Sequence, residues 1–183
     1  MVSQECLDFL KGCLKSIPDF PKPGIIFRDI TSVCENPKAF AMLCEAMADS
    51  YRYLGITKVA ATEARGFVFG APIAAALNAG FVMIRKKGKL PREVYQESYD
   101  LEYGSSTLEI HRDAISAEDR VLVVDDLIAT GGTIRAAINL IQKCGGRVLG
   151  ATFAINLADL GGARMIERDF GIKTFSVLNY EGA

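Results

Sequence analysis

The sequence is poor in the residues that bind transition metals or build disulfide frameworks. It has one histidine and five cysteines among 183 residues. No two cysteines form a Cys-x-x-Cys pair, so the ligand spacing of a zinc site is missing. An odd, scattered set of thiols is typical of reduced cysteines in the cytosol. We therefore expect a cytoplasmic protein whose cysteines mostly pack in its core.

The sequence also lacks an excess of charge of either sign. Its 21 lysines and arginines nearly balance its 22 acidic residues, and the formal net charge is −1. Such a chain shows no electrostatic footprint for nucleic acid or an anionic membrane. Its first residues lack the order of a signal peptide, and no apolar run approaches membrane-spanning length. We expect small-molecule partners, with no nucleic acid and no membrane.

What the sequence does contain is an alternation of apolar segments over one domain, residues 1–183. An opening helix carries Cys6, Leu10, Cys13 and Ile17 on one face. We expect further helices at residues 37–54, 66–78, 134–144 and 163–169, and strands at residues 58–62, 81–84, 120–124, 148–155 and 172–177. Continuous apolar strands separated by helices predict an α/β fold with a mainly parallel central sheet flanked by helices. Ligands of such sheets bind beyond the carboxyl ends of the strands.

The most informative segment is residues 121–133, VLVVDDLIATGGT. A buried strand is followed by two carboxylates and then by a loop of Ala129, Thr130, Gly131, Gly132 and Thr133 that opens an amphipathic helix. Glycines let backbone N–H groups converge, and a helix N-terminus favours an anion. The loop therefore predicts a site for one phosphate monoester, although capping and a plain turn would also explain parts of it.

The two carboxylates, Asp125 and Asp126, predict a second kind of ligand group. A carboxylate about 5 Å from a phosphate charge repels it by roughly 3 kcal/mol at an effective dielectric of 20. These acids therefore need hydroxyl or cationic partners, and the diol of a ribose 5-phosphate supplies hydroxyls. The segment is neither a Walker A motif nor a Gly-x-Gly-x-x-Gly dinucleotide motif.

Segment 121–133 resembles the signature of the type I phosphoribosyltransferases, which use phosphoribosyl pyrophosphate (PRPP). The likeness extends to residues 18–30 (PDFPKPGIIFRDI), 63–67 (EARGF), 85–91 (RKKGKLP) and 99–104 (YDLEYG), in matching order. The resemblance implies the fold of that family, with a small hood that includes residues 18–30 and a flexible catalytic loop. It also implies a homodimer.

The resemblance assigns the remaining ligands of PRPP and of the base. It implies that Arg65, Lys89 and Lys86 bind pyrophosphate. Ile26 and Phe27 would pack on adenine, backbone groups of Ile26 and Arg28 would bond its edge, and Leu157 would cover its other face. The exocyclic amine of adenine needs an acceptor such as a backbone carbonyl, whereas hypoxanthine presents an oxygen there.

Residues 92–111 are polar and aromatic, and we expect them to form a mobile lid that ends in a short strand near residues 107–111. The resemblance makes Glu102 the catalytic carboxylate of this lid, with Tyr103 beside it. The sequence does not decide whether Glu102 takes a proton from the base or stabilises the cationic ribose electrostatically. We interpret His111 as a surface or lid residue.

The implied reaction transfers the 5-phosphoribosyl group from PRPP to adenine, giving AMP and pyrophosphate. Mg²⁺ would be held mainly by PRPP oxygens, with no metal site made by the protein alone. Two alternatives stay open. The acceptor could be another purine or a pyrimidine, or the chain could be a non-catalytic PRPP sensor, although a sensor usually carries a DNA-binding module.

Overall fold

The computed structural model describes residues 2–100 and 105–181, and the structural statements below refer to these residues. Its helices are α1 (Gln4–Cys13), α2 (Thr31–Cys34), α3 (Pro37–Asp49), α4 (Arg65–Ala76), α5 (Gly132–Lys143) and α6 (Gly162–Phe170), with a 3-10 turn η1 (Ala158–Leu160). Its strands are β1 (Lys15–Pro18), β2 (Ile26–Asp29), β3 (Lys58–Thr62), β4 (Gly80–Lys86), β5 (Val94–Asp100), β6 (Ser105–His111), β7 (Arg120–Ile128), β8 (Arg147–Leu157) and β9 (Thr174–Tyr180).

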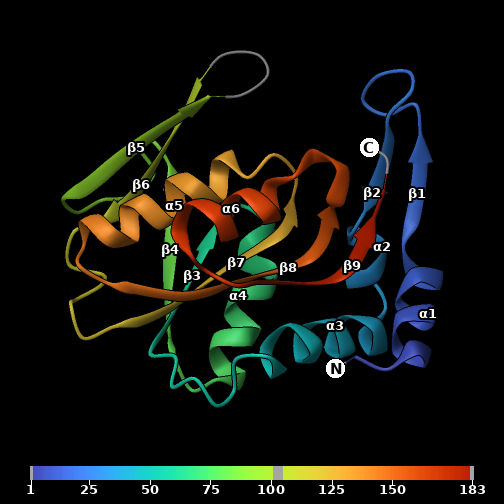
Figure 1. The fold of residues 1–183 in the computed structure, drawn as a ribbon, viewed down its shortest axis with the longest axis horizontal. Coiled ribbons are helices and arrows are strands. Elements are labelled where there is room, and N and C mark those ends of the chain that lie inside the picture. Colours follow the sequence, from blue (N-terminus) through green and yellow to red (C-terminus); the bar gives the residue numbers. More distant parts are fainter. Residues whose placement is uncertain (1, 101–104, 182–183) are drawn as a thin grey trace.

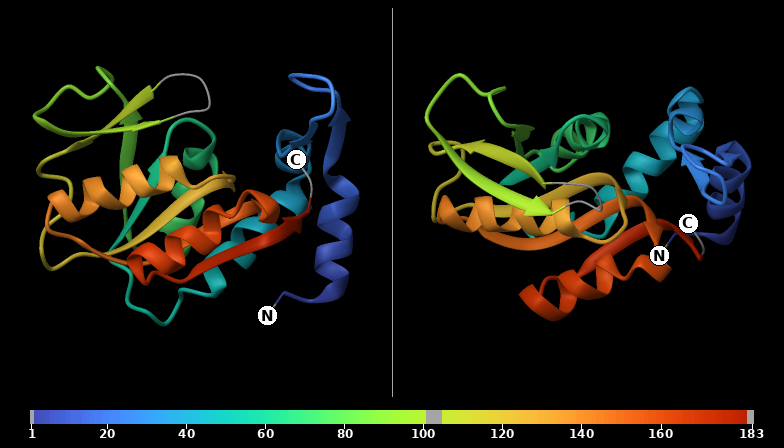
Figure 2. Two further views of the ribbon diagram at one scale, coloured as in Figure 1. Left: turned by 45° about the horizontal axis from the view of Figure 1, so that its top comes forward. Right: turned by 90° about the horizontal axis from the view of Figure 1, so that it is seen from above.

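A seven-stranded sheet forms the centre of the molecule, in the order β5-β6-β4-β3-β7-β8-β9. The five strands from β4 to β9 in this order are parallel, and β5 and β6 join one edge in antiparallel pairing. The predicted α/β fold with a mainly parallel sheet is confirmed. A separate two-stranded sheet, β1-β2, stands beside the opposite edge near the C-terminus (Figures 1 and 2). We call residues 15–29, which form this small sheet and its turn, the hood.

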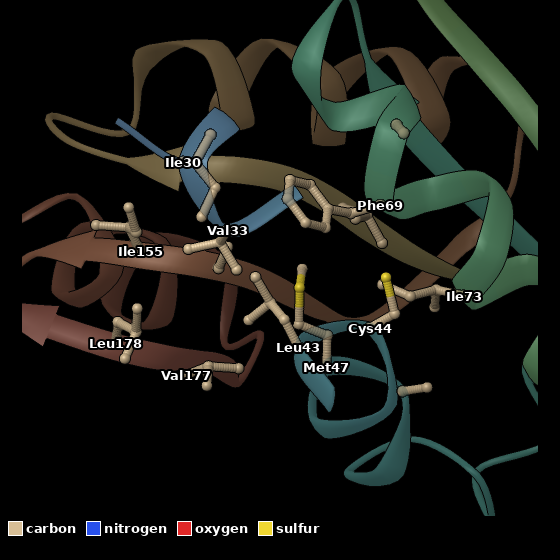
Figure 3. Close-up of a cluster of buried hydrophobic side chains, with 14 of the residues drawn as sticks. Ile30, Val33, Leu43, Cys44, Met47, Phe69, Ile73, Ile155, Val177 and Leu178 are labelled. Atoms are coloured by element: carbon tan, nitrogen blue, oxygen red, sulfur yellow. The ribbon is translucent and has the colours of Figure 1, made fainter. Parts of the chain in front are cut away.

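Helices cover both faces of the central sheet, and α3 and α4 lie opposite α5 and α6 (Figure 1). Side chains alternate between the faces along each strand. On β7, Leu122 and Val124 pack with α3 and α4, in the cluster shown in Figure 3. Val121 and Val123 pack on the other face with α5 and α6. The strand is therefore apolar at every position from Val121 to Val124, as a doubly covered strand requires.

Most of the predicted elements are present, but the ends of several differ from the prediction, and three of these differences bear on the site or the core. The first helix ends at Cys13, and Ile17 lies on β1 with 39% of its surface exposed, so its place on the helix face was wrong. Helix α3 ends at Asp49 rather than near residue 54. Strand β7 continues to Ile128, so Asp125 and Asp126 belong to the strand and do not follow it.

Residues 92–111 differ most from the prediction. Their described part is mainly a β-hairpin, β5 and β6, whose register runs from Val94 opposite His111 to Asp100 opposite Ser105. Within this hairpin, the side chains of Leu108 and Ile110 on β6 are buried. His111 is also buried, and its ring nitrogen accepts a hydrogen bond from the Arg92 amide at 3.3 Å, so its interpretation as a surface residue was wrong.

None of the helices in the described residues has both the length and the apolar character that a membrane-spanning helix needs.

The start of α6 holds the loop of residues 129–133 in place. The Gly162 amide donates to the Ala129 carbonyl at 2.9 Å. A Cβ added at Gly162 would lie 2.3 Å from that oxygen and 2.7 Å from the Gly131 nitrogen. Two stretches of backbone therefore touch here, which only glycine permits.

We predict that Gly162→Ala lowers the free energy of unfolding by about 1–3 kcal/mol, because the added methyl must push the loop away from α6. Chemical denaturation monitored by circular dichroism measures this change. Gly12→Ala in α1 is the matched control, since a Cβ there meets nothing within 4 Å. Helix propensity should make the control neutral or slightly stabilising. Equal effects of the two changes would contradict the close-packing argument.

Candidate active site

A cavity of about 460 Å³ opens where β3 and β7 end and where α4 and α5 begin. This is the predicted edge of the sheet. The residues that line it come from the end of β3, the start of α4, β4, β5 and the β7–α5 connection: Thr62, Glu63, Ala64, Arg65, Lys86, Tyr99 and residues 125–134. The phosphate loop, both aspartates and two of the three predicted pyrophosphate ligands therefore surround one space.

The loop of residues 129–133 has the backbone geometry of an anion site. Gly131 has a φ of +86°, a conformation that favours glycine, and α5 begins at the next residue. The first amides of a helix have no partner within it, and they carry the positive end of the helix dipole. Thr130 is exposed and Thr133 is half-buried, so their hydroxyls are accessible from the cavity that they line. The loop can thus hold a phosphate by backbone and hydroxyl donors.

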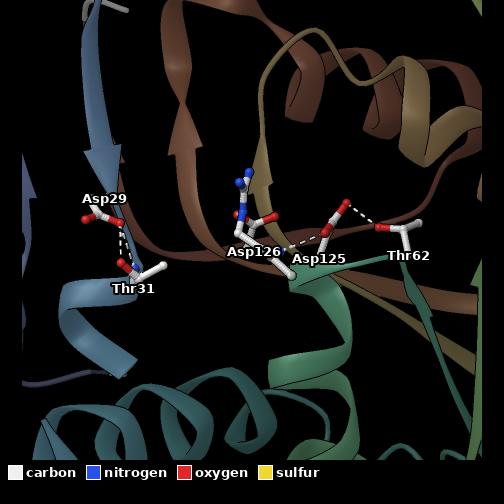
Figure 4. Close-up of polar contacts among 6 residues, drawn as sticks. Asp29, Thr31, Thr62, Asp125 and Asp126 are labelled. Carbon is white, nitrogen blue, oxygen red and sulfur yellow. Dashed lines mark hydrogen bonds and ion pairs between the residues drawn. The ribbon is translucent and has the colours of Figure 1, made fainter. Parts of the chain in front are cut away.

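The two aspartates leave β7 toward opposite faces of the sheet, because they are neighbours on a strand. Asp125 accepts a 2.5 Å hydrogen bond from the Thr62 hydroxyl through Oδ2. Its Oδ1 accepts the backbone amide of Asp126 at 2.9 Å. Figure 4 shows Thr62, Asp125 and Asp126 in sequence across the ends of β3 and β7. Asp125 is therefore fixed on both of its oxygens.

The surroundings of Asp125 disfavour its charged form. Burial, followed by the charge of Asp126, raises the pKa of Asp125 well above its ordinary value, although the bonds from Thr62 and the Asp126 amide oppose this. Gly66 allows the close packing that causes the burial, since a Cβ there would lie 2.8 Å from Asp125 Oδ1. Asp125 is thus a packed, hydrogen-bonded part of the cavity wall.

Asp126 pairs with a residue of the neighbouring loop. The Arg65 Nε donates to Asp126 Oδ2 at 2.5 Å, and 53% of the Arg65 side chain is exposed against 10% of Asp126. Burial lowers the pKa of Arg65, but the charge and hydrogen bond of Asp126, with weaker effects of Asp125 and Asp29, raise it overall. Arg65 is therefore a firmly charged group with one edge bound to the wall of the cavity.

A second ion pair joins the segments that carry the predicted pyrophosphate ligands. Glu63 Oε2 accepts Arg85 Nε at 2.8 Å and the Lys86 amide at 3.0 Å. Lys86 lines the cavity. Lys89 is exposed and is not among the residues that line the cavity, while its carbonyl oxygen accepts a hydrogen bond from Arg85 at 3.1 Å. The basic turn is thus held to the start of α4 by Glu63.

The predicted base-binding residues lie in and beside the hood. Ile26 is 42% exposed, and Phe27 packs edge-to-face on Phe20 with ring centroids 5.2 Å apart. The Arg28 guanidinium donates to the Ser16 hydroxyl at 2.6 Å and lies 4.3 Å from the centroid of the Tyr180 ring.

The end of β8 reaches the same place from the central sheet. Leu157 pairs in register with Tyr180 on β9. Since Tyr180 contacts Arg28, the hood and Leu157 are brought together by the end of β9. Asp29, at the end of β2, is near enough to Arg65 to affect its charge. Among the described residues that line the polar cavity, none of the four predicted base-binding residues is present, so the structure does not bring them into the same space as the loop of residues 129–133.

Sequence reasoning missed several residues of this site. The sequence placed Thr62 only in a strand, Glu63 only in a loop and Arg85 only in a basic run. Their hydrogen bonds could not be predicted, because the partners lie far apart in the chain and meet only through strand pairing. Tyr99 lines the cavity from β5. The pair Gly161-Gly162 was a signal that could have indicated close backbone packing. Glu102 and Tyr103, the predicted lid residues, lie outside the described residues.

The donors around the cavity suit a hard cation shared with a substrate. The lining residues offer carboxylate, hydroxyl and carbonyl oxygens but neither histidine nor cysteine. Within residues 2–100 and 105–181, no group of three histidine, cysteine or acidic side chains could hold a metal by itself. Mg²⁺ is commonly bound by one or two carboxylates together with substrate phosphates.

Comparisons with known proteins agree with this geometry. A family model described as "Phosphoribosyl transferase domain" matches residues 29–174. The adenine phosphoribosyltransferase of Serratia proteamaculans is 57% identical over 176 residues, which cover 96% of this chain and 88% of that protein.

Solved structures give the same result. The crystal structure of adenine phosphoribosyltransferase from Rhodothermus marinus matches with a TM-score of 0.90 and 44% identity, over 97% of this chain and 100% of that one. The enzyme from Saccharomyces cerevisiae, complexed with an imino-altritol bisphosphate and adenine, matches with a TM-score of 0.88 and 36% identity, over 96% and 100% of the two chains. The chain therefore belongs to the phosphoribosyltransferase family, and the three relatives given above, which match nearly the whole chain, are adenine phosphoribosyltransferases.

Proposed function

We propose that this chain transfers the 5-phosphoribosyl group of PRPP to N9 of adenine, forming AMP and pyrophosphate. The observation that carries the proposal is the single cavity that collects the phosphate loop, the Asp125-Asp126 pair and the cations Arg65 and Lys86. The likeness to adenine phosphoribosyltransferases over nearly the whole chain supports the choice of acceptor.

The loop of residues 129–133 holds the 5′-phosphate by its amides and by the hydroxyls of Thr130 and Thr133. The aspartates take the ribose diol, and Asp126 is the better acceptor because both oxygens of Asp125 already accept hydrogen bonds, whereas Arg65 occupies Oδ2 of Asp126. With phosphate and diol fixed, C1′ is aimed at the base. Much of the acceleration then comes from positioning.

Pyrophosphate leaves from C1′ toward the cations of the cavity. Arg65 and Lys86 line the wall on that side, and Glu63 holds the two segments that carry them together. Lys89 would reach the leaving group only by extending its exposed side chain from the same turn. When bound with PRPP, Mg²⁺ would neutralise charge on the leaving group; it would be held mainly by PRPP oxygens, with carboxylates that line the cavity, such as Asp125 or Asp126, as its ligands from this chain.

Adenine lies between the hood and the end of β8. Ile26 and Phe27 pack on one face of the purine and Leu157 on the other, while backbone groups of Ile26 and Arg28 bond its edge. A carbonyl acceptor there matches the exocyclic amine of adenine and opposes the oxygen of hypoxanthine.

Glu102, with Tyr103 beside it, is the proposed catalytic carboxylate, and this assignment rests on family resemblance. The β5–β6 hairpin carries residues 101–104 between its strands. We propose that residues 92–111 act as a lid that excludes water, which otherwise hydrolyses the activated ribose. We also propose a homodimer, as in the family, and a cytoplasmic location, in keeping with five free thiols.

We predict strict selection of the acceptor base. With PRPP and Mg²⁺, kcat/KM for adenine should exceed that for hypoxanthine, guanine and orotate by about a thousandfold or more, because wrong bases leave buried polar groups unpaired. Release of pyrophosphate in a coupled assay measures each rate. Comparable rates with another base would refute the adenine assignment, and no turnover with any base would favour a PRPP sensor.

We predict that Glu102→Leu lowers kcat by about a hundredfold or more, since the variant loses a group that acts on the reacting atoms. The KM for PRPP should change little. Steady-state kinetics at saturating adenine measures both constants. Glu93→Gln is the control, because Glu93 lies just before β5 and its side chain is 86% exposed. A kcat that stays at the wild-type value in Glu102→Leu would remove this residue from the mechanism.

A further inference from the structure

Two residues assigned to adjacent parts of PRPP are bonded to each other. Asp126 is proposed for the ribose and Arg65 for the pyrophosphate, yet Arg65 Nε donates to Asp126 Oδ2 at 2.5 Å. A guanidinium has five N–H donors in one plane, and this bond uses the Nε edge. The two Nη groups at the end of the side chain keep four donors for a ligand.

We propose that Asp126 is a positioning residue for Arg65, holding its Nε so that its Nη groups face the pyrophosphate of PRPP. The inference rests on the proposed function and extends it. It gives Asp126 a second task beside ribose binding, and it connects the ribose and pyrophosphate subsites through one hydrogen bond.

Burial indicates which partner directs the other. Asp126 is nearly buried, and its amide is bound to Asp125, which is itself bound to Thr62. These bonds tie Asp126 to the ends of two central strands, β7 and β3. Arg65 is half exposed and has a long, flexible side chain. Asp126 therefore provides the fixed point, and Arg65 loses conformational freedom before the substrate arrives.

Two possible roles of Asp126 predict opposite effects of removing it. If Asp126 pairs with Arg65 only while no ligand is bound, Asp126 competes with pyrophosphate for Arg65, and its carboxylate also repels the anion. Removing Asp126 would then strengthen pyrophosphate binding. If Asp126 positions Arg65, removing it weakens binding despite the loss of a negative charge.

The test is the affinity of the full chain for Mg²⁺-pyrophosphate, a ligand without a ribose, measured by titration calorimetry. Asp126→Ala should weaken this affinity by about tenfold. Asp126→Asn should stay within about threefold of wild type, because its side-chain oxygen still accepts from Arg65 Nε. The same Asn variant should bind PRPP more weakly, since it loses a charged acceptor for the diol.

A double-mutant cycle separates positioning from a general loss of folding. In an Arg65→Ala background, the Asp126→Ala change should cause no further loss of pyrophosphate affinity, and thermal melting should show both proteins folded. Asp29→Asn is the charge control. Asp29 interacts with Arg65 through charge, but its carboxylate accepts bonds from Thr31 instead. This control should stay within about twofold of wild type.

Three results would overturn the inference: tighter or unchanged binding in Asp126→Ala, additive losses in the cycle, or an equal loss in Asp29→Asn. Failure of the wild-type chain to bind pyrophosphate would refute the proposed function itself, and the inference with it.

Discussion

The parallel pairing of β3 with β7 is the constraint on which the site depends. Its register runs from Lys58 opposite Val121 to Ala61 opposite Val124. Thr62 and Asp125 follow as neighbours, and the helices after both strands begin at the same edge of the sheet. Parallel strands place their carboxyl ends together, so one register brings two loops, two helix N-termini and a pair of acids to one cavity.

Ion pairs with carboxylates also fix the orientation of two arginines at and beside the cavity. A substrate with several phosphates needs cations, yet free cations would repel one another and scatter their side chains. Here the side chains of Arg65 and Arg85 are each held by a carboxylate, Asp126 and Glu63 respectively. The loop of residues 129–133 adds positive potential from backbone amides, which carry no net charge. Orientation is thus built in before the ligand binds, which is the general condition for electrostatic catalysis.

Much of this arrangement could be predicted from local sequence. The strand at Lys58–Thr62 was predicted with its correct bounds, and the loop of residues 129–133 was correctly predicted to open a helix; its phosphate-binding role stays a prediction. These features depend on composition and on neighbours in the chain. The extension of β7 through Asp125 and Asp126 was not predicted, because carboxylates usually end a buried strand. Strand β7 continues past the two aspartates because it pairs with β8 as far as Ile128 opposite Asn156.

Features that depend on distant partners were harder to predict. The polar sequence of β5 gave little sign of a strand. The strand is formed by its pairing with β6 and by its contacts with α5, where Asn139 and Lys143 donate hydrogen bonds to the Glu97 carboxylate. Thr62 and Glu63 gain their hydrogen bonds only when strand residues 63 and 22 positions away in the chain lie beside them. The site roles of Arg65, Lys86, Lys89, Ile26, Phe27, Arg28 and Leu157 came from family resemblance, and physical pattern alone would have left them as surface or core residues.

The hood is a sheet of its own. Strands β1 and β2 pair with each other and share no ladder with the seven central strands, and the hood reaches the end of β9 through the stacking of Arg28 on Tyr180. Apart from Leu157 on β8, the groups that would recognise the nucleobase are therefore encoded by a short, contiguous stretch of chain near the N-terminus. Evolution can exchange such a module, and with it the acceptor, while the machinery for the activated sugar is inherited intact.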